Sequence, residues 1–167
     1  MHGKTDMIIV LMYLKPGIKF TVQRKEESIM NDHLDSMGRD GIFWRIGREE
    51  SPELLASIKN LENVDFRDKR GLTYLHVAAI NHKLQVIKLL LEKGANPNCV
   101  DKRGATPVLM ALGVKNRNNQ EILRLFLEHG LDLEKKIHGM TIKETILSLS
   151  LEEPELAETI KKYESKE

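Results

Sequence analysis

The chain has very little cysteine. Among its 167 residues there is one, Cys99, so an intramolecular disulfide and every metal site with several cysteine ligands are excluded. A protein without disulfides is typical of a reducing compartment, and we expect a cytoplasmic location. We expect Cys99 to be a buried small apolar residue rather than a nucleophile, because no histidine is near it in the sequence.

Long hydrophobic stretches are also missing. The longest apolar run, residues 7–14, has eight residues, far fewer than the roughly 20 that a membrane-spanning helix needs. The same run makes a poor signal peptide, because it is at the short limit and residues 15–19 offer no small-residue cleavage site. We therefore expect no association with a membrane.

The chain has no excess of charge of either sign. Lysine and arginine total 26, aspartate and glutamate total 25, and the net charge is +1. This balance argues against nucleic acid or an anionic membrane as the partner of the whole chain. Any electrostatic recognition must come from local patches. The repeated part of the chain also lacks the aromatic residues, interleaved with basic ones, that bases stack on.

Catalytic and cofactor-binding motifs are absent from the sequence. It contains neither the Gly-x-x-x-x-Gly-Lys-Ser/Thr loop nor the Gly-x-Gly-x-x-Gly turn that cradle phosphate groups. His82, His129 and His138 fall at separate loop or helix-end positions, without the spacing of a zinc site. We therefore expect no catalytic residue, no metal and no cofactor.

One tetrapeptide, DKRG, occurs twice. It begins at Asp68 and again at Asp101, 33 residues later. The same offset relates three further pairs, Thr73 and Thr106, Leu75 and Val108, and Ala78 and Ala111. A three-residue insertion around 115–118 changes the offset to 36, and VIKLLLEKG (86–94) then aligns with ILRLFLEHG (122–130). A register kept over two helix-length segments indicates a repeated structural unit.

Each unit contains a turn, a short helix and a longer helix. Asp-x-x-Gly forms the turn, because glycine supplies backbone conformations that other residues avoid. Thr73 and Thr106 are predicted N-caps of the short helix, with Pro107 at a favoured first position. Gly94 and Gly130 end the longer helix in successive units. This helix has more apolar surface than one helix pair can bury, so the units must stack.

The pattern resembles the ankyrin repeat, which has a period of about 33 residues and a T-P-L-H-x-A signature. The matching residues of the first full unit are Gly71, Thr73, Leu75, His76, Ala78, Ala79, Leu89, Leu90, Gly94, Ala95 and Asn98. Tyr74 replaces the proline of the signature, and Leu109 replaces the histidine in the next unit. The resemblance implies an all-α repeat solenoid whose helix-turn-helix units are joined by β-hairpin-like turns. It also implies that His76 makes structural hydrogen bonds between turns and helices.

Weaker copies flank the two clear units and give about four repeats with degenerate caps. In the upstream copy, Phe43 and Ile46 take apolar positions of the first helix, and Ser51 caps the second. In the downstream copy, Thr141 takes the N-cap position and the second helix starts near Pro154. We place the repeat domain at 38–165, divided approximately into an N-terminal cap repeat (38–67), two full repeats (68–100 and 101–136) and a C-terminal cap repeat (137–165).

Residues 1–37 are a non-repeat extension with three interpretations. The apolar run and the alternating residues 18–23 can form a hairpin across Pro16-Gly17, which would have to pack on the stack because two strands alone are marginal. The segment can instead be disordered. In the third interpretation, Lys25-Glu26-Glu27 is encoded by a purine-rich ribosome-binding sequence, and the native chain of a bacterial source starts at Met30.

A repeat stack presents a concave face lined by turn tips and first helices. In the ankyrin family, the variable contact positions flank the turn glycine and lie at the end of the first helix. The resemblance places them at Arg45, Arg48, Lys69, Arg70, Leu72, Ile80, Asn81, Lys102, Arg103, Ala105, Leu112, His138 and Met140. For Trp44 two interpretations stay open: we expect it in the core of the cap repeat, and the alternative is an anchor at an interface.

The contact positions include a Lys-Arg pair at the same place in both full units. Four glutamates are expected on the second helices or at their ends, namely Glu92, Glu121, Glu128 and Glu134, which would separate the two signs of charge. We expect the turn tips to form a basic ridge that meets a protein with an acidic surface patch. The alternative is that these are ordinary solvated turn positions.

The resemblance implies a monomeric, non-catalytic module that binds a partner protein. One specific form of this hypothesis is an inhibitor, because small stand-alone ankyrin proteins of bacteria resemble immunity proteins, which neutralise a toxin. Small size and the lack of an enzymatic site or a second domain motivate that idea. The alternative is an accessory or scaffold protein that binds nucleic acid or an enzyme.

Overall fold

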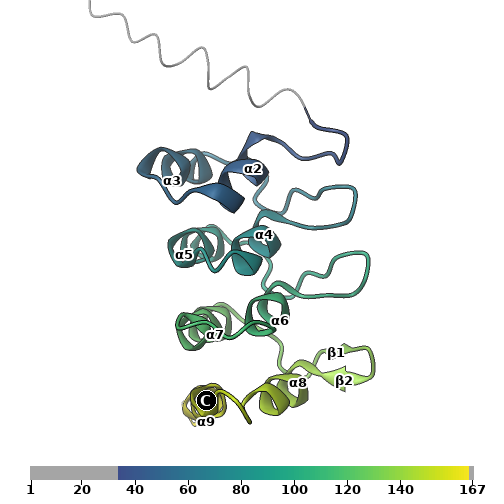
Figure 1. Ribbon diagram of the computed structural model, residues 1–167, viewed down its shortest axis with the longest axis vertical. Helices are drawn as coiled ribbons and strands as arrows, with labels where there is room; N and C mark the ends of the chain where they lie inside the picture. Colours follow the sequence, from purple (N-terminus) through teal and green to yellow (C-terminus); the bar gives the residue numbers. More distant parts are fainter. Residues whose placement is uncertain (1–33, 166–167) are drawn as a thin grey trace, which may run out of the picture.

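Residues 34–165 are described by the structure, a computed structural model. They form helix pairs that stack along one axis, with a turn projecting from the same side of each pair (Figure 1). The pairs are α2 (Gly41–Arg48) with α3 (Pro52–Lys59), α4 (Tyr74–Ile80) with α5 (Leu84–Glu92), α6 (Pro107–Leu112) with α7 (Asn119–Glu128), and α8 (Ile142–Leu149) with α9 (Pro154–Glu164). The predicted all-α repeat solenoid is confirmed. The hairpin expected in residues 7–23 and the start at Met30 lie outside the described residues.

Side-chain caps determine where five of the helices begin. The capping residues are Asp40 for α2, Ser51 for α3, Thr73 for α4, Thr106 for α6 and Thr141 for α8. Each cap oxygen accepts a hydrogen bond from a backbone N–H of the first turn, which satisfies a donor that the helix itself cannot pair. The remaining helices α5, α7 and α9 have no such bond, so they depend on packing against their neighbours.

The tips of successive turns are bonded to one another through their backbones. Lys69 N donates to Met37 O over 2.8 Å, and Lys102 N donates to Arg70 O over 2.9 Å. Gly71 has a φ angle of +82°, and a Cβ atom there would lie 3.1 Å from Lys102 N. Glycine is therefore needed at this position both for its conformation and for the close approach of the next tip.

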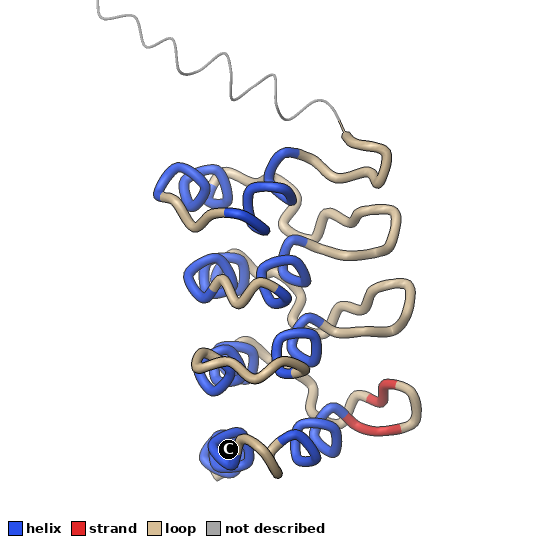
Figure 2. The backbone as a smooth tube through the Cα atoms, in the orientation of Figure 1, coloured by secondary structure: helices blue, strands red, loops and turns tan. Residues whose placement is uncertain are grey.

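The hairpin character of the turns is regular only in the last of the described ones. There, β1 (Lys136–Ile137) and β2 (Met140–Thr141) pair in antiparallel fashion, with Lys136 opposite Thr141 (Figure 2). The turn before α4 has a single antiparallel bridge between Arg67 and Thr73. The turns thus follow the expected β-hairpin-like course with little regular strand.

The apolar sides of the helices pack into one continuous core between the units. Ala78 and Ala79 are completely buried, and their small side chains let α4 pack closely against its neighbours. Phe43, Phe66 and Tyr74 form an aromatic cluster with ring centroids 4.7 to 5.8 Å apart. Because Phe43 belongs to α2 and Tyr74 to α4, this cluster joins the upstream cap unit to the first full unit.

His76 has the structural role that the resemblance implied. Its Nδ1 accepts a hydrogen bond from Thr73 N at 3.0 Å, and its Nε2 lies 3.2 Å from Ala105 O in the next turn. Since a backbone N–H can only donate, Nδ1 is unprotonated and the Nε2 hydrogen is donated to Ala105. Burial of this neutral ring lowers the pKa of His76 below its ordinary value of 6.5. The histidine connects two repeats.

The predicted insertion lengthens the loop between α6 and α7, and Asn119 fixes this loop to the last unit. Asn119 Nδ2 donates to Val114 O over 2.9 Å and to both carboxylate oxygens of Glu153 over 3.1 and 3.2 Å. Both side chains are buried. The longer loop is therefore held in place by a buried polar contact rather than by packing alone.

Candidate functional site

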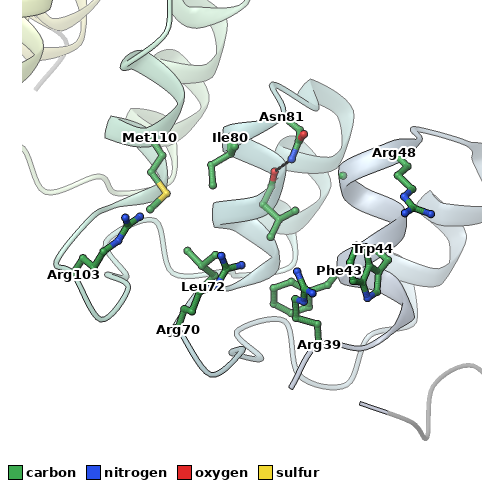
Figure 3. Close-up of a pocket in the computed structure, with 12 residues that line it drawn as sticks. Arg39, Phe43, Trp44, Arg48, Arg70, Leu72, Ile80, Asn81, Arg103 and Met110 are labelled. Atoms are coloured by element: carbon green, nitrogen blue, oxygen red, sulfur yellow. Dashed lines mark hydrogen bonds between the residues drawn. The ribbon is translucent and has the colours of Figure 1, made fainter. Parts of the chain in front are cut away.

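A pocket of about 380 Å³ lies on the concave face, which is the surface formed by the turns and the first helices. It spans the first three units, and Figure 3 shows its side chains. The lining residues are Arg39, Phe43, Trp44, Gly47, Arg48, Arg70, Leu72, Val77, Ile80, Asn81, Arg103 and Met110. Four of them are arginines and none is acidic, so the pocket combines positive charge with apolar surface.

Arg70 and Arg103 occupy equivalent places in successive turns and have the same surroundings. Arg70 Nε lies 3.2 Å from Asp68 Oδ2, and Arg103 Nε lies 3.4 Å from Asp101 Oδ2. Both aspartate side chains are buried, while the side chains of Arg70 and Arg103 are 53% and 82% exposed. The carboxylates therefore hold the Nε side of each guanidinium, and the Nη atoms remain on the surface.

The two buried aspartates also organise the backbone of their turns. Asp68 Oδ1 accepts from the N–H groups of Arg70 and Leu72, and Asp101 Oδ1 accepts from those of Arg103 and Ala105. Burial alone would raise the pKa of Asp101, but these hydrogen bonds outweigh it and hold the pKa below its ordinary value of 3.8. Asp101 is thus kept as a carboxylate that orients Arg103.

The lysines of the predicted basic ridge differ from the arginines. Lys69 Nζ donates to Ser36 O in the preceding turn over 2.9 Å, so its ammonium group takes part in the contact between turns. Lys102 is exposed, and neither lysine lines the pocket. Within residues 34–165 the positive charge that faces the pocket comes from arginine.

Trp44 is on the surface, and the expectation that it belongs to the core is wrong. Its side chain is 43% exposed, and its Nε1 donates to Asp35 Oδ2 over 3.2 Å. The guanidinium carbon of Arg39 lies 4.1 Å from the ring centroid, and that of Arg48 lies 5.3 Å from it, within the range of cation–π attraction. Phe43, next to it on α2, is the aromatic residue that enters the core.

The two arginines beside Trp44 are not equivalent. Arg39 forms a 2.8 Å ion pair with Asp35, and the hydrogen bond from Arg39 N to that carboxylate lowers the pKa of Asp35 to about 2. Arg48 is exposed and has no carboxylate within 4 Å among the residues that the structure describes. Arg48 is therefore the pocket guanidinium with its charge least compensated.

Six of the predicted contact residues come together in the pocket, namely Arg48, Arg70, Leu72, Ile80, Asn81 and Arg103. Ile80 is 46% exposed and gives the pocket apolar surface. Leu72 lines the pocket with its edge only, since it is 6% exposed. Leu112 is 2% exposed and packs in the core, so its predicted place on the surface is wrong.

The remaining predicted residues lie outside the pocket. Arg45 does not line the pocket and pairs with Glu49 at 2.5 Å. Ala105 is half-buried, and its carbonyl group is the partner of His76. His138 and Met140 are exposed in the last turn.

Sequence reasoning missed Arg39, Phe43, Gly47, Val77 and Met110 as lining residues. Met110 and Val77 are related by the same 33-residue offset as the two DKRG turns. Extending that register along the first helix would have found both. Asp35 and Gly38 lie 33 residues before Asp68 and Gly71. The same register therefore aligns Arg39 with Leu72, a predicted contact position, and would have found it as well.

The expected separation of charge is weaker than predicted. Arg124 pairs with both Glu121 and Glu128 at 2.5 Å, and Glu92 lies 3.9 Å from Lys88 on the same helix. Glu134 falls in the turn before β1 and not on a second helix. The second helices α5 and α7 therefore carry paired charges of both signs. The unmixed positive charge is that of the arginines that line the pocket.

Cys99 has a histidine beside it that the sequence did not reveal. Its Sγ lies 3.8 Å from His76 Nδ1 and 3.7 Å from Thr73 Oγ1. Burial raises the pKa of the Cys99 thiol, and His76 is a neutral acceptor already used by Thr73. This geometry stabilises the thiol and not the thiolate, so the predicted role of Cys99 as a buried small residue is confirmed.

Residues 34–165 contain neither a cluster of metal ligands nor a helix suited to span a membrane. Among these residues, no cluster of three or more His, Cys, Asp or Glu side chains has the arrangement of a metal site. In the same part of the chain, no helix has the length and apolar character needed to cross a membrane.

Comparisons with known proteins agree on one family. The chain is 41% identical over 111 residues to human SH3 and multiple ankyrin repeat domains protein 2, covering 65% of this chain and 6% of that protein. It is 35% identical over 80 residues to ankyrin repeat protein 14 of vaccinia virus (strain Western Reserve), covering 48% of this chain and 33% of that protein. It spans 5% of the length of human SH3 and multiple ankyrin repeat domains protein 1, with 30% identity over 111 residues.

The fold and the sequence pattern point the same way. A crystal structure of an ankyrin repeat domain from Acinetobacter baumannii AYE superposes with a TM-score of 0.68 at 19% sequence identity, covering 78% of this chain and 67% of that chain. The family model for ankyrin repeats in three copies matches residues 45–141, which is 97 of the 167 residues. The protein therefore belongs to the ankyrin-repeat family.

Proposed function

We propose that this protein binds a partner protein stoichiometrically through its concave face and catalyses no reaction itself. Ankyrin repeats are protein–protein interaction modules. The observation that carries the proposal is the pocket, in which four guanidinium groups surround apolar side chains and no carboxylate is present in the lining. A partner surface that is acidic at its rim and apolar at its centre complements this arrangement.

Rigidity of the concave face supports the same proposal. Backbone hydrogen bonds of 2.8 and 2.9 Å join the tips of the first three turns, and the buried aspartates accept backbone hydrogen bonds within the second and third of these turns. A surface whose backbone is already ordered loses less conformational entropy when a partner binds.

Inhibition is the specific form of this function that we propose, including the neutralisation of a toxin by an immunity protein. A rigid module can inhibit simply by covering the active site of its partner. If the source is bacterial, a toxin-like reading frame beside the gene identifies the partner to test. Expression of that toxin should arrest growth, and co-expression of this protein should restore it, whereas continued arrest would contradict the immunity role.

The test of the concave face is affinity capture with two matched double variants. Arg48→Glu/Ile80→Asp introduces negative charge into the pocket at two exposed positions. Arg117→Glu/Leu151→Asp makes the same chemical changes at exposed positions outside the pocket. The tagged wild-type protein and the control should retain one dominant stoichiometric partner from the source cell, and the pocket variant should lose it. Retention by all three proteins would contradict binding through this face.

The alternative class of partner and the remaining expectations have direct tests. We propose that the protein is a monomer located in the cytoplasm. Light scattering after size-exclusion chromatography tests the oligomeric state, and cell fractionation tests the location. Retention of DNA or RNA on a filter at low salt would favour the nucleic-acid alternative. The apolar part of the pocket argues against that alternative, because a phosphate backbone leaves such surface unmatched.

A further inference from the structure

We propose that the pocket between α2, α4 and α6 is the receptor for one acidic segment of a polypeptide, with an apolar side chain inserted between carboxylates. This inference rests on the proposed function and names the chemistry of the partner. Two rows of side chains define the site, and Figure 3 shows them running along the stack. Arg39, Arg70 and Arg103 come from the turns, and Trp44, Ile80 and Met110 come from the first helices.

The arginine row is arranged to bind carboxylates. Asp68 and Asp101 occupy the Nε atoms of Arg70 and Arg103, and the exposed Nη atoms remain available as paired donors. A guanidinium group fits a carboxylate with two parallel hydrogen bonds, and these bonds are stronger than those between neutral groups. A lysine ammonium would give charge without this geometry, and the pocket contains no lysine.

The apolar row requires that the bound segment carry an apolar side chain as well as carboxylates. Trp44 is 43% exposed and Ile80 is 46% exposed, so each has a large apolar area in contact with solvent. The two side chains and half-buried Met110 lie within one pocket bordered by arginines. Burying an apolar side chain there removes this surface from water, while the charged rim selects the residues on either side of it.

The repeat fixes the spacing between carboxylates. Arg70 and Arg103 hold equivalent positions on neighbouring units, and adjacent packed helices such as α4 and α6 are typically about 8–10 Å apart. Lys102 N bonds to Arg70 O, and this contact fixes the position of one tip relative to the next. An extended polyproline-like segment rises about 3.1 Å per residue and returns to the same side every third residue. Carboxylates three positions apart therefore match the two arginines.

A polypeptide explains the pocket better than a nucleic acid does. Phosphates would satisfy the arginines, but Ile80 and Met110 would gain nothing from a sugar-phosphate chain. Stacking of successive bases needs several exposed aromatic rings, and Trp44 is the aromatic residue of this pocket with an exposed ring, since Phe43 is 3% exposed. We therefore assign the site to an acidic peptide and keep nucleic acid as an outcome of the test.

Trp44 is the sole tryptophan of the chain, so tryptophan fluorescence reports directly on the pocket. The probe is a synthetic heptapeptide with phenylalanine at its fourth position and glutamates at its third and sixth positions, so that the two carboxylates are three positions apart with the phenylalanine between them. Titration should change Trp44 emission saturably, and Arg70→Gln/Arg103→Gln should weaken binding by at least ~10-fold. The matched control Arg117→Gln/Arg124→Gln removes the same charge outside the pocket and should bind as wild type does.

Three further comparisons separate the chemistry from charge and folding. Arg70→Lys/Arg103→Lys keeps the charge and should still weaken binding several-fold, because the paired donors are lost. A peptide with glutamines in place of glutamates, and one with glycine in place of phenylalanine, should each bind at least ~10-fold more weakly. Urea unfolding of every variant identifies any loss that comes from the fold.

Several results would overturn the inference and leave the proposed function intact. They are equal peptide affinity of wild-type and Arg70→Gln/Arg103→Gln proteins, no saturable binding up to about 1 mM peptide, or displacement of the peptide by an oligothymidine of the same charge. In each of these cases, a partner captured by the wild type and lost from Arg48→Glu/Ile80→Asp would still support the concave face. The proposed function itself would be contradicted if Arg48→Glu/Ile80→Asp still captured the partner.

Discussion

Removing one hydroxyl group tests how the upstream cap unit is joined to the rest of the stack. Tyr74 is 2% exposed, and its hydroxyl donates to the carboxylate of Asp40, whose other oxygen accepts from Phe43 N at 3.0 Å. Tyr74→Phe keeps the ring in the aromatic cluster and deletes only that bond. A hydrogen bond to a charged group contributes about 1.5–3 kcal/mol, so we expect the free energy of unfolding to fall by about 1.5–2 kcal/mol at neutral pH.

The same contact predicts how this difference depends on pH. Burial, with the hydrogen bond to Asp40 as the second cause, raises the pKa of Tyr74 far above its ordinary value of 10.0. Above pH 10 the unfolded chain therefore loses a proton that the native chain retains, and the wild type loses stability that the phenylalanine variant does not lose. The difference should shrink by about 0.4 kcal/mol at pH 10 and by about 1.4 kcal/mol at pH 11.

Urea unfolding of both proteins between neutral pH and about pH 11 measures the difference directly. The two stabilities should become nearly equal near pH 11. Tyr163→Phe is the control, since the Tyr163 hydroxyl has no hydrogen-bond partner within residues 34–165, and it should change stability by less than about 0.5 kcal/mol. A difference for Tyr74→Phe that stays constant up to pH 11 would refute the reasoning, because Tyr74 would then ionise as readily in the native state as in the unfolded state.

Three other predictions concern buried polar groups. His76→Leu removes the side-chain partner of the Thr73 N–H group and of the Ala105 carbonyl group and should cost about 2–4 kcal/mol. Because burial lowers the native pKa of His76, its neutral ring stabilises the fold above about pH 6.5. Urea unfolding should show this stability falling on acidification in the wild type and not in the variant. Asn119→Asp places a second carboxylate beside buried Glu153 and should lower the free energy of unfolding by about 2–4 kcal/mol at pH 7. This loss relative to wild type should shrink as the pH is lowered and one of the two carboxyl groups becomes protonated. A loss that does not depend on pH would contradict this cause. Cys99 is 3% exposed, so its reaction with a thiol reagent should be slow in native protein. The reaction should accelerate at the urea concentration at which the helical circular dichroism signal is lost. Rapid reaction in the native state would contradict the burial of Cys99.

The sequence was sufficient to predict the helix ends and the stacking order of the units that keep the repeat pattern. Thr73, Thr106 and Gly94 were assigned correctly because capping and helix termination depend on a few neighbouring residues. The internal offset of 33 then fixed the relation between units without any knowledge of their packing. The insertion before α7 was found for the same reason, since it changes the offset.

The errors fall where the side-chain direction depends on packing between units. Trp44 and Phe43 are adjacent on α2, and only the position of α4 decides that Phe43 enters the core. Leu112 is different, because the offset of 33 aligns it with buried Ala79 and not with Ile80, so the correct register predicts its place in the core. The partner of Lys69, a carbonyl group in the preceding turn, lies beyond any local pattern. A periodic pattern predicts the backbone more reliably than the facing of single residues near helix ends.

In each of the identical tetrapeptides the aspartate stabilises the turn, and the arginine two residues later is the one that we propose binds a partner. Asp68 and Asp101 are buried, each with two backbone N–H donors and one guanidinium, so replacing either would disturb its turn. Arg70 and Arg103 contribute a largely exposed ion pair, and such pairs typically add less than about 1 kcal/mol to stability. The arginines can therefore vary with little cost to the fold, whereas the aspartates cannot. It follows that substitutions of the arginines report on binding, and that charge reversal at Lys69, which also joins two turns, would mix the two effects.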